Sequence, residues 1–170
     1  DWRGEIRSVG VFTVGGSWRC TGVMVNNTAQ DGTPYFLTAR HCNVDAASAP
    51  SVVVYWNFES PVCDQHGGGS LEDFQTGAIW RASYDASDFT LAEFDDPPAP
   101  AHGVTFAGWD AGGATPAGAV TIHHPSTDEK SISFENDPLT VTTYLTDPSP
   151  GNGTHLRIHD WDLGTTEQGS

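Results

Sequence analysis

The sequence predicts an all-β protein built from small antiparallel barrels. Short β-prone runs recur along the 170 residues, with Gly, Asn, Asp or Ser turns between them, at the spacing expected of a barrel. No stretch has the period of a convincing amphipathic helix. In addition, 37% of the residues are apolar, which is typical of a globular protein rather than a disordered chain.

The first six runs form one group. The first run alternates small or polar residues with apolar ones and ends in a Gly-Gly-Ser turn, and the fourth is the most β-prone of the chain. The expected strands are 8–14, 19–25, 35–38, 51–58, 76–83 and 89–94. Six strands can close a small barrel, so residues 1–94 are predicted to form an N-terminal lobe.

A proline-rich segment at 95–101 follows this group. Prolines at that density cannot continue a strand ladder, so the segment is predicted to be a crossover between two lobes. Four further strands are expected, at 104–109, 119–123, 139–144 and 155–159. Four strands are too few for a second six-stranded barrel, so residues 102–170 are predicted to form only part of a second lobe.

Charge and hydropathy limit the partners. Seven Lys and Arg residues against 22 Asp and Glu residues give a net charge of −15, which disfavours nucleic acid and anionic membranes. No apolar run approaches the roughly 18 residues of a membrane span. Neither a nucleic acid nor a membrane is therefore expected as a partner.

Two residues stand where strands begin or end. His41 follows the β-prone run at 35–38, which would hold its side chain rigidly. Because histidine can take up and return a proton near neutral pH, His41 is a candidate general base. From the residues alone, an ordinary core or surface histidine is the alternative. Asp88 stands at the entrance to the strand at 89–94, where an aspartate is usually a turn or cap residue.

The motifs around these residues resemble those of the chymotrypsin-like serine endopeptidases. The segment Leu37-Thr38-Ala39-Arg40-His41-Cys42 resembles the family's histidine motif, and Ser87-Asp88-Phe89-Thr90-Leu91 resembles its aspartate motif. Cys20-Thr21-Gly22 lies where the family has the cysteine that precedes both motifs. Three further segments resemble one bacterial branch, the lysyl endopeptidases. They are Gly108-Trp109-Asp110, Ile122-His123-His124-Pro125 and Thr166-Glu167-Gln168-Gly169-Ser170.

This resemblance implies a fold and a mechanism. The fold is a chymotrypsin-like double β-barrel, with the first barrel complete and the second only partly present. His41 would be the general base, Asp88 would orient it, and Gly169 would lend its N–H to the oxyanion hole. Ser170 would directly precede the nucleophilic serine, which is expected on a continuation or second chain that also carries the specificity pocket. The implied activity is hydrolysis of peptide bonds in proteins or peptides through an acyl-enzyme, after Lys or Arg.

The cysteines acquire a pairing from the same resemblance. It implies a disulfide between Cys20 and Cys42, which would stabilise the fold by roughly 3 kcal/mol in the chain-entropy model. A disulfide implies an oxidising setting, so the protein is expected to be secreted. Cys63 is then left over, and it either pairs with a cysteine on a segment outside this sequence or is a free thiol.

Other functions remain open. A non-catalytic binding module with the protease fold, or an inactive fragment, would keep both motifs without a nucleophile. A thiol enzyme at Cys63 is less favoured, because that residue adjoins a Gly-rich loop and no base motif. His155 and His159 invite a metal site, but on a strand they would lie about 13 Å apart. No metal and no cofactor are expected.

Overall fold

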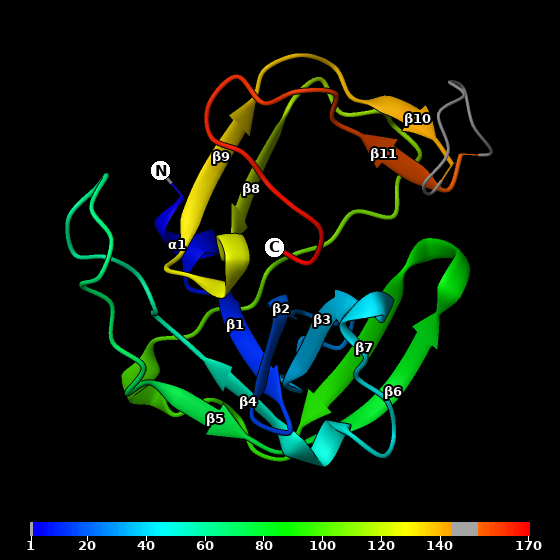
Figure 1. The fold of residues 1–170 in the computed structure, drawn as a ribbon. Helices are drawn as coiled ribbons and strands as arrows, with labels where there is room; N and C mark the ends of the chain where they lie inside the picture. The colour runs from blue at the N-terminus through cyan, green and yellow to red at the C-terminus, as the bar shows by residue number, and fades with distance from the viewer. Residues whose placement is uncertain (1, 144–152) are drawn as a thin grey trace.

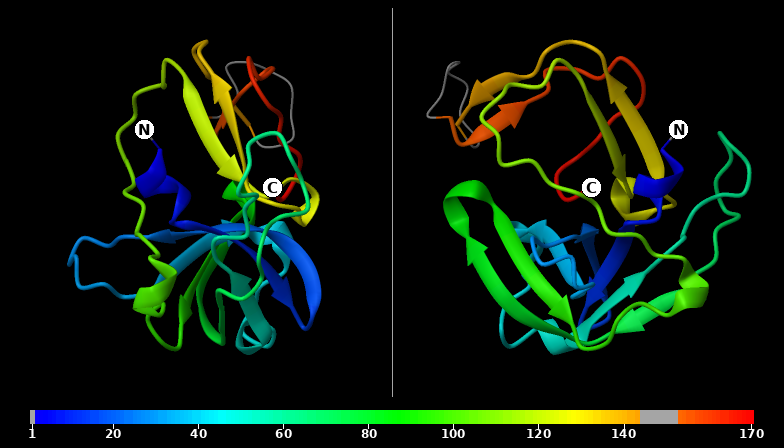
Figure 2. Two further views of the ribbon diagram at one scale, coloured as in Figure 1. Left: turned by 90° about the vertical axis from the view of Figure 1, so that its left-hand side faces the viewer. Right: turned by 180° about the vertical axis from the view of Figure 1, so that it is seen from behind.

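Two groups of antiparallel strands make up the fold of this computed structural model, which describes residues 2–143 and 153–170. A curled seven-stranded sheet forms one group, two hairpins form the other, and the C-terminal segment runs between them (Figures 1 and 2). The strands are β1 (Val9–Val14), β2 (Ser17–Val25), β3 (Tyr35–Ala39), β4 (Val52–Tyr55), β5 (Phe74–Thr76), β6 (Ala78–Tyr84), β7 (Phe89–Phe94), β8 (Ala119–His123), β9 (Ser131–Glu135), β10 (Thr140–Thr142) and β11 (His155–Arg157). The helical turns are α1 (Arg3–Ile6), η1 (Arg40–Cys42), η2 (Ala49–Ser51), η3 (Asp85–Ser87), η4 (Pro100–His102) and η5 (Pro125–Thr127).

The large sheet closes on itself at Gly77. Its strands pair in the order β5-β4-β1-β2-β3-β7-β6, and the two edge strands, β5 and β6, are separated in the chain by Gly77 alone. Gly77 donates its N–H to the Val52 carbonyl (3.0 Å), and its carbonyl accepts from the Asp95 N–H (3.2 Å). Its φ is 80°, and a Cβ there would lie 2.4 Å from Asp95 Oδ2, so only glycine fits. β5 and β6 thus act as one bent strand, which reconciles the seven strands with the six predicted.

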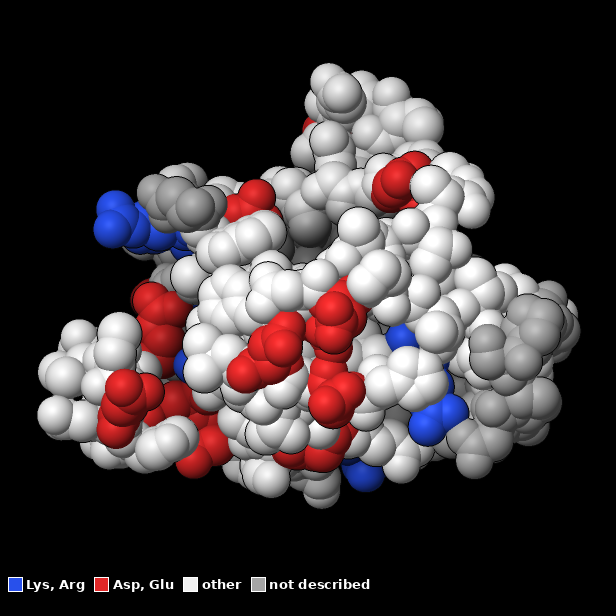
Figure 3. Space-filling model, turned by 90° about the horizontal axis from the view of Figure 1, so that it is seen from above, with Lys and Arg blue, Asp and Glu red and all other residues white. Residues whose placement is uncertain are grey.

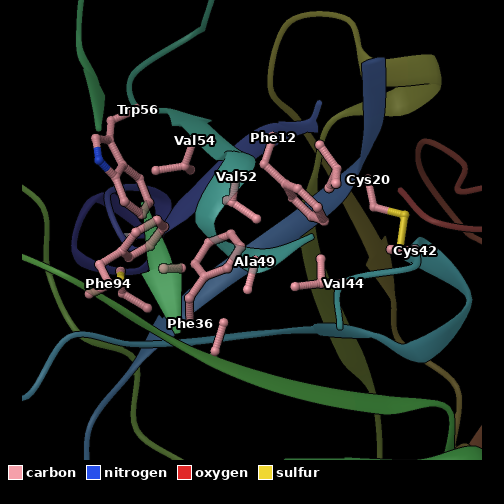
Figure 4. Packing of buried hydrophobic residues seen from close by; sticks show 14 residues of the cluster. Phe12, Cys20, Phe36, Cys42, Val44, Ala49, Val52, Val54, Trp56 and Phe94 are labelled. Atoms are coloured by element: carbon pink, nitrogen blue, oxygen red, sulfur yellow. A yellow bond between two sulfur atoms is a disulfide. The ribbon is translucent and has the colours of Figure 1, made fainter. Parts of the chain in front are cut away.

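Aromatic side chains fill the inside of this curled sheet (Figure 4). The ring centroid of Phe36 lies 5.6 Å from that of Phe12, 6.0 Å from that of Trp56 and 5.2 Å from that of Phe94. All four side chains are buried. Gly22 of β2 makes room for the central ring, because a Cβ there would lie 2.2 Å from Phe36 Cζ. The core therefore depends on the absence of a side chain at this position.

The second group consists of the hairpins β8–β9 and β10–β11. The segment after β11 returns to β9, where Phe134 and Leu163 exchange two backbone hydrogen bonds of 2.8 and 3.2 Å. This contact carries the chain back toward the curled sheet, where its last residues lie (Figure 1). Both groups are β, and no helix among the described residues is long and apolar enough to cross a bilayer.

The predicted strands of the second group needed correction. The strand expected at 104–109 does not form, because its described backbone bonds to β2 and the residue after it come from Ala107 alone, through Met24 and Asn26. β9 was not predicted, although Ile132 and Phe134 alternate with serines there. The strands expected at 139–144 and 155–159 are shorter, and Tyr144 lies outside the described residues. The short helix α1 was also not anticipated.

The packing of the core predicts that a side chain at position 22 destabilises the protein. The substitution Gly22→Ala should lower the free energy of unfolding by about 1–3 kcal/mol, because the new methyl group forces the Phe36 ring out of its position. Gly4→Ala is the matched control, since no heavy atom lies within 4 Å of a Cβ at Gly4. Urea unfolding followed by near-ultraviolet circular dichroism measures both. Equal stability of the two variants would contradict this account of the core.

Candidate active site

His41 lies in a single 3-10 turn that directly follows β3. This turn, η1, covers Arg40–Cys42, and its last residue is disulfide-bonded to Cys20 of β2. The predicted disulfide is therefore confirmed, and it ties the histidine turn covalently to the neighbouring strand. Asn43 ends the turn in the left-handed conformation (φ 61°) and donates from Nδ2 to the His41 carbonyl at 2.9 Å.

Asp88 reaches His41 through the register of two strands. β3 and β7 are antiparallel, and Ala39 at the end of β3 pairs with Phe89 at the start of β7. Asp88 directly precedes β7 with a φ of 50°, a conformation that aspartate tolerates better than most residues. The pairing of β3 with β7 thus brings together two residues that are 47 positions apart in the sequence.

The two side chains make a closely held pair. His41 Nδ1 lies 2.6 Å from Asp88 Oδ2, and the His41 backbone N–H donates to Asp88 Oδ1 at 2.9 Å. The Arg40 N–H donates to the Asp88 carbonyl, also at 2.9 Å. A carboxylate at Nδ1 keeps the ring proton there and leaves Nε2 as a proton acceptor. Nε2 is buried and has no hydrogen-bond partner among the described residues.

Gly169 lies against the Nε2 side of this histidine. Its carbonyl accepts from the Thr21 N–H at 2.8 Å, and its φ is 86°. A Cβ on Gly169 would lie 2.9 Å from Cys20 Sγ and 3.3 Å from His41 Nε2. Both the backbone angle and the lack of space therefore require glycine at this position.

Ser170 does not face the histidine. Its hydroxyl donates to the Glu167 carbonyl at 2.9 Å and accepts from the Glu167 N–H at 3.0 Å. Its own N–H donates to the same carbonyl at 3.1 Å. The hydroxyl is thus used in a local turn, and the geometry gives it no contact with His41.

A cleft of about 820 Å³ opens beside the pair. Its walls come from His41 and Asp88, from the β10 and β11 hairpin, and from the C-terminal segment at 166–169. Leu139, Leu156 and Trp161 contribute apolar surface, while Glu167 and Arg157 contribute one negative and one positive charge. Such a mixed lining can hold an extended chain with one polar or charged side chain.

The remaining cysteine lies at a different place. Cys63 is exposed and lines a second hollow of about 580 Å³, together with the N-terminal helix and Lys130. Lys130 Nζ donates to the Ile6 carbonyl at 2.9 Å, and burial lowers the pKa of this amine to about 8. No other described cysteine faces Cys63, since the other two form the disulfide.

One histidine and two carboxylates outside this site could approach a metal ion. His66, Asp128 and Glu129 have ligand atoms within 4.8 Å of one another. However, the Glu129 carboxylate already accepts the N–H groups of Gly69 and Gly67, and these bonds lower its pKa. Glu129 is thus used to hold the Gly-rich loop. His155 and His159, the pair considered from the sequence, bond to different threonines, Thr154 and Thr140.

Comparisons with known proteins identify the family and the fold of this chain. The family model of the lysyl endopeptidase C-terminal domain matches residues 2–170. Lysyl endopeptidase from Pseudomonas aeruginosa is 32% identical over 166 residues, which cover 92% of this chain and 33% of that protein. The chain therefore spans about a third of the length of this curated relative. Among solved structures, kallikrein-related peptidase 10 aligns with a TM-score of 0.50 and 18% identity, over 78% of this chain and 57% of its own.

The curled sheet and the shared fold define a chymotrypsin-like protein with one barrel and part of a second. This confirms the predicted fold class. The partly buried pair of His41 and Asp88 lies at the end of this barrel. Within that class, the chain belongs to the lysyl endopeptidase C-terminal domain family. The resemblance drawn from the sequence motifs is therefore confirmed.

Several residues that shape this site had no role in the sequence analysis. Thr21 was quoted only as part of a motif, yet its backbone holds Gly169. His124 is buried beside it, with its N–H on Thr21 Oγ1 at 2.9 Å. The glycine at 77, which closes the sheet, also went unmarked. A polar residue in a β-prone run was the only available signal at Thr21, and it is too common to be specific.

Burial of His124 makes the stability of the protein depend on pH. Desolvation lowers the pKa of His124 to about 3, whereas an unfolded histidine titrates near 6.5. Between about pH 6.5 and pH 3, His124 is therefore protonated in the unfolded chain but neutral in the folded chain. The free energy of unfolding should therefore fall by up to about 1.4 kcal/mol per pH unit from this residue, and it should be unaffected above that range.

The substitution His124→Asn tests this dependence. Asn can replace the donor that His124 Nδ1 presents to the Asp128 carbonyl at 2.8 Å, but it does not titrate. Urea unfolding between pH 6.5 and 4 should show a shallower loss of stability in this variant. Thr13→Val, at a buried residue that does not titrate, is the control and should keep the parental slope. An unchanged slope in His124→Asn would rule out this residue as the source.

Proposed function

We propose that the protein containing this chain is a serine endopeptidase that hydrolyses peptide bonds by an acyl-enzyme mechanism. His41 takes the proton from a serine hydroxyl at Nε2 and returns it to the leaving amine. Asp88 holds Nδ1, fixes the tautomer and stabilises the imidazolium. The nucleophile is the serine that follows Ser170 in the full-length protein, and the Gly169 N–H stabilises the oxyanion.

One observation carries this proposal. The buried His41 Nε2 lacks a partner among the described residues, while Nδ1 is held by a carboxylate at 2.6 Å. His123 and His124 also leave one buried ring nitrogen unpaired within the described part of the chain, so this feature alone does not single out His41. What distinguishes His41 is the group on its other nitrogen, which is a carboxylate, whereas His124 bonds to a backbone carbonyl and His123 lies against a serine hydroxyl. Gly169 approaches that same nitrogen, so a residue close behind it in the chain has a short path to the base. Family membership supports the same chemistry.

Substrates with Lys, or with Arg, before the scissile bond are the proposed preference. The name of the relative from Pseudomonas aeruginosa indicates lysyl specificity for that protein. In this chain, Glu167 and Arg157 both line the cleft with opposite charges, so the support comes from the strongly acidic molecule as a whole. On the face shown in Figure 3, Asp and Glu side chains gather near the centre, whereas few Lys and Arg side chains are visible. Such a field favours cationic substrates.

Three further proposals concern the compartment of the protein, its division into lobes and the partner of Cys63. Secretion is supported by the Cys20 and Cys42 disulfide, because such bonds persist in oxidising compartments. The division into lobes at 1–94 and 102–170, joined by 95–101, is supported by the sheet topology. Cys63 is proposed to pair with a cysteine outside this sequence, and its exposure beside the N-terminal helix supports that pairing.

The test uses the full-length protein and a fluorophosphonate probe, which reacts with an activated serine. We expect the wild type to take the label and to cleave peptides with Lys or Arg before the scissile bond faster than peptides with Ala there. Asp88→Asn should reduce kcat by about 10⁴-fold, because the tautomer is lost. His41→Ala should lose labelling, while His66→Ala, at an exposed histidine, should keep it.

The outcomes separate the alternatives. A folded wild-type protein that takes no label would leave the non-catalytic binding module as the correct description. Labelling that survives His41→Ala would mean that another base serves the serine. Efficient cleavage after Ala but not after Lys or Arg would leave the mechanism standing and overturn the proposed specificity.

A further inference from the structure

Thr21 bonds to three separate parts of the molecule. Its N–H donates to the Gly169 carbonyl at 2.8 Å. Its hydroxyl accepts from the His124 N–H at 2.9 Å, and its carbonyl accepts from Thr38 Oγ1 at 2.9 Å. One residue of β2 therefore joins the C-terminal segment, the end of β8 and the strand β3 that leads to His41.

A second contact turns these bonds into a closed circuit. The Ser126 N–H donates to Glu167 Oε1. The chain runs from Glu167 to Gly169, from Gly169 across to Thr21, from Thr21 to His124, and from His124 back to Ser126. The segment that carries Gly169 is thus held at two points, and both points lead to the same short loop after β8.

That loop is itself rigidly placed. The His124 ring is 1% exposed, stacks parallel to Phe58 at 6.1 Å, and bonds through Nδ1 to the Asp128 carbonyl. Ser126 and Thr127 have φ values of 51° and 60°, which non-glycine residues adopt only when their surroundings impose them. The Thr21 hydroxyl therefore bonds to a backbone N–H, that of His124, whose position is fixed by its surroundings.

Gly169 needs such an anchor more than most residues would. Glycine populates many backbone conformations, so the peptide groups on either side of it rotate easily unless they are held. The Thr21 N–H, whose direction is set by β2, selects one orientation of the Gly169 carbonyl and so fixes the peptide that follows Gly169. The Thr21 hydroxyl ties the same residue to the loop after β8, whose Ser126 N–H bonds to Glu167 and holds the chain before Gly169. Together these bonds limit the rotation of the peptide that carries the Gly169 N–H, and an oxyanion donor acts only when it is preorganised.

We propose that Thr21 is a positioning residue for the proteolytic reaction, holding the Gly169 segment against His41 through its hydroxyl bond to the His124 backbone. This inference rests on the proposed function. Thr21 acts through Gly169 and is not assigned a contact with substrate. Its role should therefore appear in transition-state stabilisation and not in ground-state binding.

The substitution Thr21→Val in the full-length protein isolates the hydroxyl, because valine keeps the shape and the backbone N–H. We expect kcat per titrated active site to fall about 10-fold with KM changed less than about twofold. The inhibition constant of a peptide aldehyde, which mimics the tetrahedral intermediate, should rise by about the same 10-fold factor. Titration with a fluorophosphonate counts only folded sites, so misfolded protein does not enter the rate.

Two variants make the result specific. Thr21→Ser keeps the hydroxyl and should restore most of the lost kcat. Thr13→Val makes the same substitution at a buried threonine near the tip of the β1 and β2 hairpin, outside the circuit, and should leave kcat unchanged. A wild-type kcat in Thr21→Val would overturn the inference, and so would an equal loss in Thr21→Ser.

Hydrogen exchange separates this inference from the proposed function. Exchange of the backbone amides at 165–170, measured by mass spectrometry, should be about 10-fold faster in Thr21→Val than in the wild type or in Thr13→Val. This readout does not require activity. Faster exchange in a protein that lacks hydrolysis would overturn the proposed function and leave the positioning contact standing. Unchanged exchange together with normal hydrolysis would overturn only the role of Thr21.

Discussion

The antiparallel pairing of β3 with β7 is the contact on which the rest of the site depends. A shift of this register by one residue would move every side chain of one strand to the opposite face. Phe36 of β3 and Phe94 of β7 pack against each other inside the barrel, with ring centroids 5.2 Å apart, so core packing fixes the register. The same register sets Asp88 beside His41. Stability and site geometry therefore have one physical source.

The second group of strands and the C-terminal segment complete the cleft beside His41 and Asp88. The barrel alone presents His41 and Asp88 at an edge, whereas the C-terminal segment brings Gly169 over the imidazole and walls the cleft. That segment is held from both sides, by Thr21 of the barrel and by the loop after β8. Holding the segment at both ends keeps its local dipoles in place, which is what electrostatic stabilisation of an oxyanion requires.

The position of Lys130 suits a preference for lysine before the scissile bond. It is the only lysine of the sequence, and its side chain is 3% exposed with Nζ bonded to the Ile6 carbonyl. A protease that cleaves after lysine would therefore find no accessible lysine in this folded chain. The cost of burial appears in the lowered pKa of the amine, and Glu59 at 3.8 Å offsets part of it. The lysine thus anchors the N-terminal segment without offering a cleavage point.

The sequence by itself determined the local features. Alternation and turn residues gave the all-β class and most strands of the barrel, and the motifs singled out His41 and Asp88. Only the resemblance to a family, and not the spacing of three cysteines, supplied the pairing of Cys20 with Cys42. Tertiary structure decided the bend at Gly77 and the contacts of Thr21. It also decided that residues 104–109 form no strand and that residues 131–135 form β9. The physical reason is range. Periodicity and turn chemistry act over a few residues, whereas the approach of residues 21, 124 and 169 follows from packing between segments far apart in the chain.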